Sequence, residues 1–108
     1  MRALPADSLE YFDETAFGNT ALLVVEIADT SLRFDRVEMA GVYARAGIKE
    51  YWILNLVDNQ VEVHRDSEAN ASAMFGFHYK TVQIWRLGES VTPLAAPSET
   101  IMVAELLP

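Results

Sequence analysis

The sequence predicts a single α/β (or α+β) domain with a mixed sheet and one main helix. Two observations lead to this class. Two apolar runs, LLVVEIA and YWILNLV, flank a helical pattern, and the whole unit spans 21–55. That length suits a helix crossing between two parallel strands. Alternating segments then follow at Gln60–Arg65 and Phe77–Arg86, which extend the sheet with antiparallel strands. We expect one domain over 1–108, with an irregular segment at 1–20 and the core at 21–108.

The strand–helix–strand unit carries clear local signals. A strand is predicted over Ala21–Ala28, and a helix over Asp35–Ala46. Asp35 at the helix start and Glu38 three positions later fit a capping box. Gly47 follows the helix, where a left-handed residue commonly ends it. Met39 belongs to the apolar stripe of this helix, together with Val42, Tyr43 and Ala46 at helical spacing.

The second half of the chain reads as strands and turns. Tyr51–Val57 is a predicted strand, with a tight turn at Asp58 and Asn59. In the next strand, Val61 and Val63 share one face, and Glu62 and His64 share the other. A polar loop is expected at Asp66–Gly76. Beyond Arg86 we expect short strands at Ser90–Leu94 and Thr100–Val103, and a helical turn at Ala104–Leu107.

Composition excludes several classes of function. The chain has 16 acidic and 8 basic residues, a net charge of −8, which disfavours binding that relies on neutralising phosphates. Cysteine is absent, so disulfides, zinc–thiolate sites and thiol nucleophiles are excluded. No apolar run approaches the ~20 residues that span a bilayer, and no signal peptide is recognisable, so we expect a cytoplasmic protein without a membrane partner.

Glu26 is the principal candidate site residue, because it interrupts the apolar run LLVVEIA. An unpaired buried carboxylate is costly, so a compensating interaction is expected. Two interpretations stay open. Glu26 coordinates a metal or takes part in catalysis, or it lies on an edge strand and reaches solvent. His64 and His78 lack a second ligand at metal spacing, which favours packing or surface roles for both.

The phrases VVEIADTSLRFDR, YARAGIKEYWILNL and VEVHR resemble the Uma-type restriction endonuclease family of the PD-(D/E)XK nuclease superfamily. The resemblance runs from about Leu22 to the end and is most specific over Val24–Arg65. It implies a restriction-endonuclease-like core, Mg²⁺ as cofactor, and nucleic acid as substrate. It also implies that Glu26 holds the metal, with Asp29 and Asp35 near the site.

Two departures from the family pattern alter this expectation. The resemblance implies a lysine on the helix, four residues after Asp35, and Met39 stands there. The family's Pro-Asp strand is not recognisable, so the chain reads as the C-terminal part of a member. We therefore expect a degenerate, inactive site, for which bound Mg²⁺ and no bound metal both stay open. The alternative function is a non-catalytic module that assembles or binds a protein. Because the expected sheet lacks its first strands, a homo-oligomer is predicted.

Overall fold

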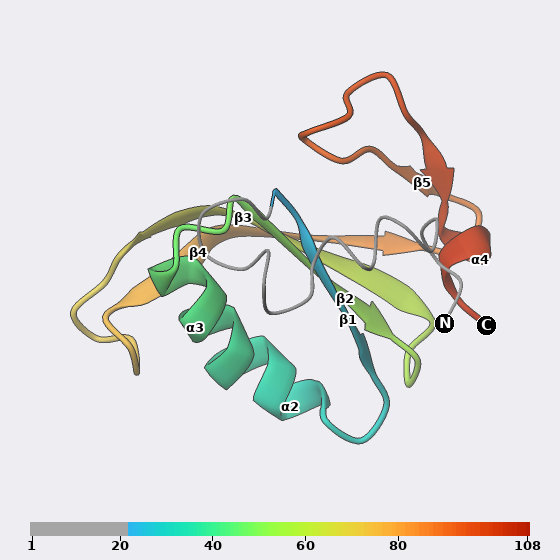
Figure 1. The fold of residues 1–108 in the computed structure, drawn as a ribbon. Coiled ribbons are helices and arrows are strands. Elements are labelled where there is room, and N and C mark those ends of the chain that lie inside the picture. The colour runs from blue at the N-terminus through green and yellow to red at the C-terminus, as the bar shows by residue number, and fades with distance from the viewer. Residues whose placement is uncertain (1–21) are drawn as a thin grey trace.

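The computed structural model describes residues 22–108, which form a four-stranded mixed sheet with a helix on one face (Figure 1). The strands lie in the order β1 (Val24–Ala28), β2 (Glu50–Asn55), β3 (Gln60–Ala69) and β4 (Phe77–Arg86). β1 and β2 are parallel, and the other two pairs are antiparallel. The predicted mixed α+β class is therefore confirmed. The irregular segment expected at 1–20 lies outside the described residues.

The helix that connects β1 to β2 consists of three consecutive pieces. These are α2 (Leu32–Phe34), a π-helical turn η1 (Asp35–Met39) and α3 (Ala40–Arg45). It ends as the sequence predicts, because Gly47 has φ of 80° and the Ile48 N–H bonds the Tyr43 carbonyl at 3.1 Å. Its start was predicted wrongly. The helix begins three residues before Asp35, so the expected capping box is not formed.

Strand boundaries differ from the sequence prediction by a few residues. β1 begins at Val24, and β2 ends at Asn55, where the turn to β3 starts. β3 continues to Ala69, four residues beyond Arg65, so the loop before β4 is shorter than expected. The strand predicted at Phe77–Arg86 is confirmed with those bounds.

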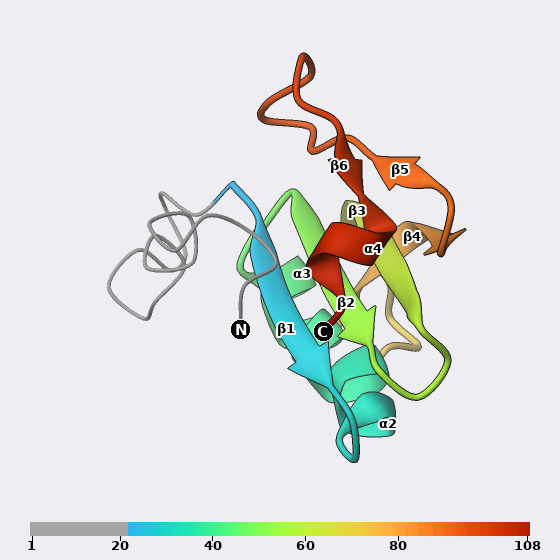
Figure 2. The same ribbon diagram turned by 90° about the vertical axis from the view of Figure 1, so that its right-hand side faces the viewer.

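The C-terminal region folds onto the sheet. β5 (Ser90–Val91) pairs with β6 (Ile101–Met102), and α4 (Val103–Leu106) follows directly. Both strands are shorter than expected, and the helical turn begins one residue earlier. In Figure 2, α4 and α3 lie on opposite sides of the sheet.

Both faces of the sheet are consequently covered, and the core has two parts. On the helix side, Val24, Tyr51 and Ile53 pack against residues of α3. On the other side, Trp52, Leu54 and Val61 pack against α4. This double cover explains why all six residues of β2 are buried. None of the helices in the described part of the chain is long and apolar enough to cross a membrane.

Candidate active site

Glu26 lies on the helix-covered face of β1, between two core residues of that face, Val24 and Ala28. Its side chain is half-buried, and Oε2 accepts a hydrogen bond of 2.6 Å from the Tyr43 hydroxyl on α3. The sequence had led us to expect Glu26 on a central strand, with its carboxylate near the N-terminal half of the helix. Both expectations were wrong, because β1 is the outermost strand on its side of the described sheet and the carboxylate meets the C-terminal half of the helix.

Asp35 points into the protein from the π-helical turn and is buried. Its Oδ2 accepts a hydrogen bond from Ser31 Oγ at 2.8 Å, and its backbone carbonyl accepts one from Tyr51 Oη at 3.1 Å. The Asp35 N–H already bonds the Ser31 carbonyl, so this residue is inside the helix and cannot be its N-cap. The side chain is therefore free to face the strands.

Two neighbouring tyrosines contact these residues, since Tyr43 donates to the Glu26 carboxylate and Tyr51 to the Asp35 backbone carbonyl. Tyr43 and Tyr51 have ring centroids 4.9 Å apart. Burial raises the pKa of Tyr43 well above its ordinary value, and the hydrogen bond to Glu26 and the negative charge of Asp35 raise it further. Burial also raises the pKa of Tyr51, with added contributions from Asp35 and Glu26. Both hydroxyls consequently remain protonated and can donate hydrogen bonds. The negative charges of Glu26 and Asp35 both help to raise the pKa values of these two tyrosines.

The other two candidate positions are not drawn into this group. Met39 is partly buried and packs against the helix-side core, as its place on the apolar stripe indicates. Asp29 is exposed just after β1. No ionisable side chain therefore stands at the position where the resemblance implies a lysine.

The described residues do not fit a complete metal centre. Within 22–108 there is no group of three His, Asp or Glu side chains that could hold a cation. Glu26 and Asp35 each accept a hydrogen bond from a protein hydroxyl. Mg²⁺ requires a nearly octahedral set of oxygen ligands, usually including water and substrate phosphates. Two carboxylates that are each hydrogen-bonded within the protein do not supply that set.

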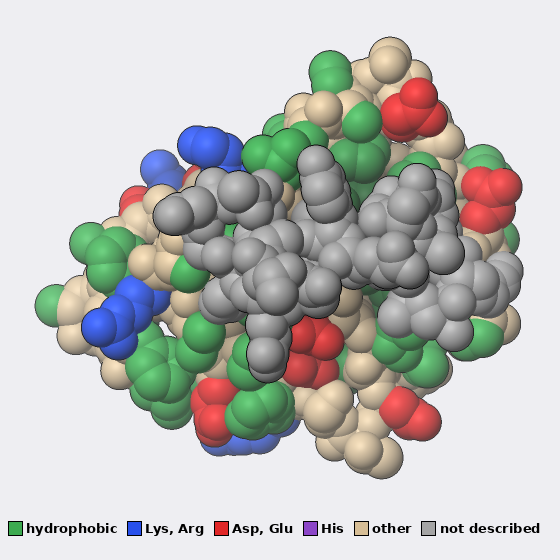
Figure 3. Space-filling view, in the orientation of Figure 1, with side chains coloured by type: hydrophobic (Ala, Val, Ile, Leu, Met, Phe, Trp, Pro, Cys, Tyr) green, Lys and Arg blue, Asp and Glu red, His purple; other side chains and the backbone are tan. Residues whose placement is uncertain are grey.

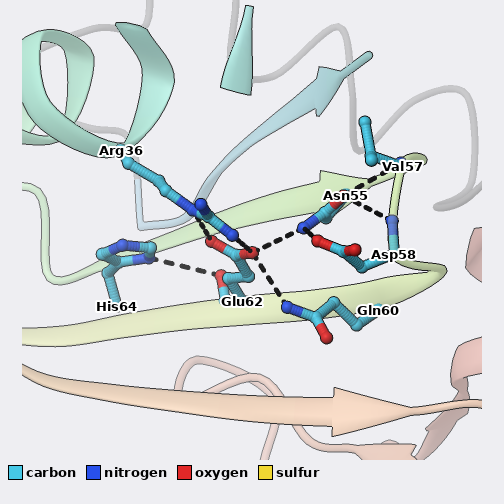
Figure 4. Close-up of polar contacts among 7 residues, drawn as sticks. All are labelled: Arg36, Asn55, Val57, Asp58, Gln60, Glu62 and His64. Carbon is cyan, nitrogen blue, oxygen red and sulfur yellow. Dashed lines mark hydrogen bonds and ion pairs between the residues drawn. The ribbon is translucent and has the colours of Figure 1, made fainter. Parts of the chain in front are cut away.

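A second polar cluster, which was not predicted from the sequence, centres on Glu62 of β3 (Figure 4). Glu62 is almost fully buried and forms a two-pronged ion pair with Arg36, with distances of 2.9 and 2.6 Å. Asn55 Nδ2 and Gln60 Nε2 also donate to Glu62 Oε2, at 2.8 and 3.0 Å. Arg36 thereby links the helix to β3.

These donors determine the ionisation of Glu62. Burial acts to raise the pKa of its carboxyl, but the hydrogen bonds from Arg36, Asn55 and Gln60 outweigh burial and lower the pKa to about 2. The pKa of His64 is lowered too, but here burial is the main cause, because burial disfavours the charged form of an imidazole. Its Nδ1 lies 3.3 Å from the Glu62 carbonyl oxygen.

The sequence contained a signal for this cluster. Glu62 and His64 were correctly placed on the face opposite Val61 and Val63, but that face was not recognised as the one that the helix covers.

A third buried carboxylate, Glu50, fastens the C-terminal region to the sheet. Its side chain is fully buried and accepts hydrogen bonds from Trp52 Nε1 at 2.8 Å and from Arg65 Nη2 at 2.7 Å. The Leu94 N–H bonds its other oxygen at 2.8 Å, and Arg65 also donates to the Thr92 carbonyl. This cluster is structural, because all of its partners lie within the fold.

A mixed sheet with a parallel β1–β2 pair, a helix crossing between those strands, and an acid on the covered face of β1 is consistent with a nuclease-like core. Comparison with protein families agrees. The family model Uma2, described as "Putative restriction endonuclease", matches residues 3–104, and the chain belongs to that family.

The family match begins upstream of Leu22, where the recognisable resemblance begins, and it supports a nuclease-like function. No curated protein and no solved structure matches the chain significantly.

Proposed function

We propose that this chain is a nuclease-like domain of the Uma2 family that does not cleave nucleic acid and acts through assembly or protein binding. The observation that carries the proposal is Met39. It stands where the family resemblance implies a lysine, and its side chain packs against the helix-side core. A thioether carries no charge and cannot be protonated, so it cannot stabilise the negative charge that develops during phosphodiester cleavage.

The environment of Glu26 supports the same proposal. Its carboxylate is engaged by Tyr43 at 2.6 Å, and the described residues contribute no third ligand for a cation. The charge of the chain also disfavours a nucleic-acid ligand. On the face in Figure 3, Lys and Arg side chains lie in separate groups between acidic and hydrophobic ones. A net charge of −8 repels a polyanion.

Metal-dependent cleavage is the second candidate, and one observation favours it. Glu26 and Asp35 both raise the pKa of Tyr43 and of Tyr51, so the two carboxylates lie near the same pair of rings between the helix and the sheet. If this candidate holds, Glu26 is the residue that would hold Mg²⁺, whose chemistry is to polarise the phosphate and generate the attacking hydroxide. The two candidates therefore differ in what Glu26 does for activity.

Plasmid nicking with purified protein separates the candidates. Supercoiled DNA is incubated with Mg²⁺ or Mn²⁺ and with the wild type, Glu26→Ala, Met39→Lys, or the control Glu99→Ala, which alters an exposed acid outside the site. We expect no metal-dependent nicking from any of them, since loss of one charge-stabilising group typically costs about 100- to 1000-fold in rate. Met39→Lys restores only the lysine, because the acid of the family's Pro-Asp strand is not recognisable in this sequence. Nicking by the wild type and Glu99→Ala that disappears in Glu26→Ala would establish cleavage instead.

A further inference from the structure

A cleft lies away from Glu26, between the helix, β3, β4 and the 70–76 loop. Its volume is about 410 Å³, which is within the range of small-molecule sites. Neither Glu26 nor Asp35 nor Met39 lines it. The walls combine Val37 of η1, Met74 of the loop, and Phe77 and Val82 of β4 with the polar side chains of Arg36 and His64.

One wall of this cleft is held in place by a close contact. Phe75 packs directly on Gly41 of α3, and a Cβ atom at position 41 would lie 2.9 Å from the Phe75 ring. Any side chain at position 41 would force this ring to shift. The loop is also closed by its own hydrogen bonds, including Asn70 N–H to the Gly76 carbonyl at 2.8 Å. The cleft is therefore formed without a ligand.

The charges around the cleft are already compensated. The Arg36 guanidinium is paired with Glu62 at 2.6 Å, and His78 Nε2 lies 2.7 Å from Glu68 Oε2. Burial favours the neutral form of His64. A charged ligand would thus find no free opposite charge among these groups, and an anion would also meet the net charge of −8.

His64 supplies a directional contact. A neutral imidazole has one donor and one acceptor nitrogen, and Nδ1 must be the donor when it bonds the Glu62 carbonyl at 3.3 Å. Nε2 is then the acceptor nitrogen of a nearly buried side chain that forms part of the cleft wall. The Tyr79 hydroxyl donates its hydrogen to the Ile48 carbonyl at 2.7 Å, so it is not a donor for a ligand.

We propose that this cleft binds a small, uncharged aromatic molecule that carries an N–H or O–H donor for His64. Apolar walls and aromatic rings bury the flat body of such a ligand, and a single acceptor orients its polar edge. This binding site is independent of the absence or presence of nuclease activity.

The test uses the chain 1–108 and three related probes: indole, 1-methylindole, which lacks the donor, and the anion indole-3-acetate. Binding is followed by ligand-observed NMR and by the shifts of the His64 ring protons. We expect saturable binding of indole with Kd of roughly 0.1–1 mM, the range for a fragment of this size. 1-Methylindole leaves the His64 acceptor without a donor, and the carboxylate of indole-3-acetate finds no opposite charge in the cleft. Each should therefore bind at least about threefold more weakly than indole.

Two variants of cleft residues and one control variant locate the binding site. Val82→Trp fills the mouth of the cleft from a half-exposed position and should weaken indole binding about tenfold or more. Val57→Trp, at an exposed position in the β2–β3 turn, is the matched control and should bind as the wild type does. Met74→Ala removes part of one wall and should weaken binding even if Val82→Trp fails to fold.

No saturable indole binding by the wild type, or equal binding by Met74→Ala and the wild type, would overturn the proposal. Equal affinity for all three probes would show that His64 does not orient the ligand and would overturn it too.

Discussion

The Tyr43 hydroxyl donates a hydrogen bond of 2.6 Å to the Glu26 carboxylate and so joins α3 to β1. The contact explains how an acid is tolerated inside an otherwise apolar strand. Its side chain is only half-buried, and the charge has a short hydrogen bond to a donor that remains protonated. Edge placement and a compensating partner, which were separate interpretations of the sequence, thus occur together.

Removing this donor should destabilise the fold. For Tyr43→Phe we expect a loss of about 1–2 kcal/mol in the free energy of unfolding, since a hydrogen bond to a charged group is broken while the ring remains. Urea denaturation followed by tryptophan fluorescence measures it. In a cycle with Glu26→Gln, the two losses should not add, because both substitutions weaken the same contact. Fully additive losses would mean that the bond does not contribute.

The Arg36–Glu62 ion pair should matter more than an ordinary surface pair. Arg36→Met leaves a carboxylate with 3% side-chain exposure without its cation. Loss of one partner of a fully buried pair costs about 3–5 kcal/mol. The Arg36 side chain is 44% exposed, which reduces this to roughly 2 kcal/mol.

The matched control is Arg33→Met, at an exposed position on α2, which should change stability by less than about 0.5 kcal/mol. Equal unfolding midpoints for the two variants would contradict the role assigned to Arg36.

Glu62 should also make stability depend on pH in the acid range. Its pKa in the folded state is about 2, below the ordinary value of 4.5. Its stabilising contribution is therefore complete above about pH 4.5 and is lost as pH falls from 4.5 towards 2. Denaturation curves measured across this window should show a steep loss of stability in the wild type and a shallower one in Glu62→Gln. Parallel curves would contradict this.

His64 makes a separate contribution to the pH dependence of stability, at higher pH than that of Glu62. Its lowered pKa means that the unfolded chain takes up the proton first, so stability declines as pH falls below the ordinary histidine value of 6.5. The two components can be distinguished, because only the one at lower pH disappears in Glu62→Gln.

Self-association remains a prediction. β4 is the outermost strand on its side of the described sheet, and Val82 and Leu87 are exposed on or beside it. Unpaired strand edges and apolar surface favour pairing with another chain. We expect a homodimer at micromolar concentration by sedimentation velocity. A monomer throughout a tenfold concentration series would refute it and would remove assembly from the proposed function.

The sequence predicted the fold better than the site. Strand and helix periodicity, Gly47 and the alternation of Val61 and Val63 are local signals, and each was sufficient to place its element. The role of Glu62 depends on Arg36, 26 positions away, meeting it across the helix–sheet interface. No local pattern shows that meeting. The start of the helix was missed for a related reason, since Asp35 bonds Ser31 and faces the strands instead of capping.

The parallel pairing of β1 with β2 has a consequence for synthesis of the chain. Every ladder partner of β1 lies at 51–55, beyond the helix, whereas β2, β3 and β4 follow one another through short turns. On the ribosome, β1 emerges first but cannot complete its pairing until β2 has been translated. The hairpin contacts need only short loops to close, so we expect the antiparallel strands to organise readily once they emerge. β1, which holds Glu26 in an apolar run, is therefore synthesised before the strand with which it pairs, β2.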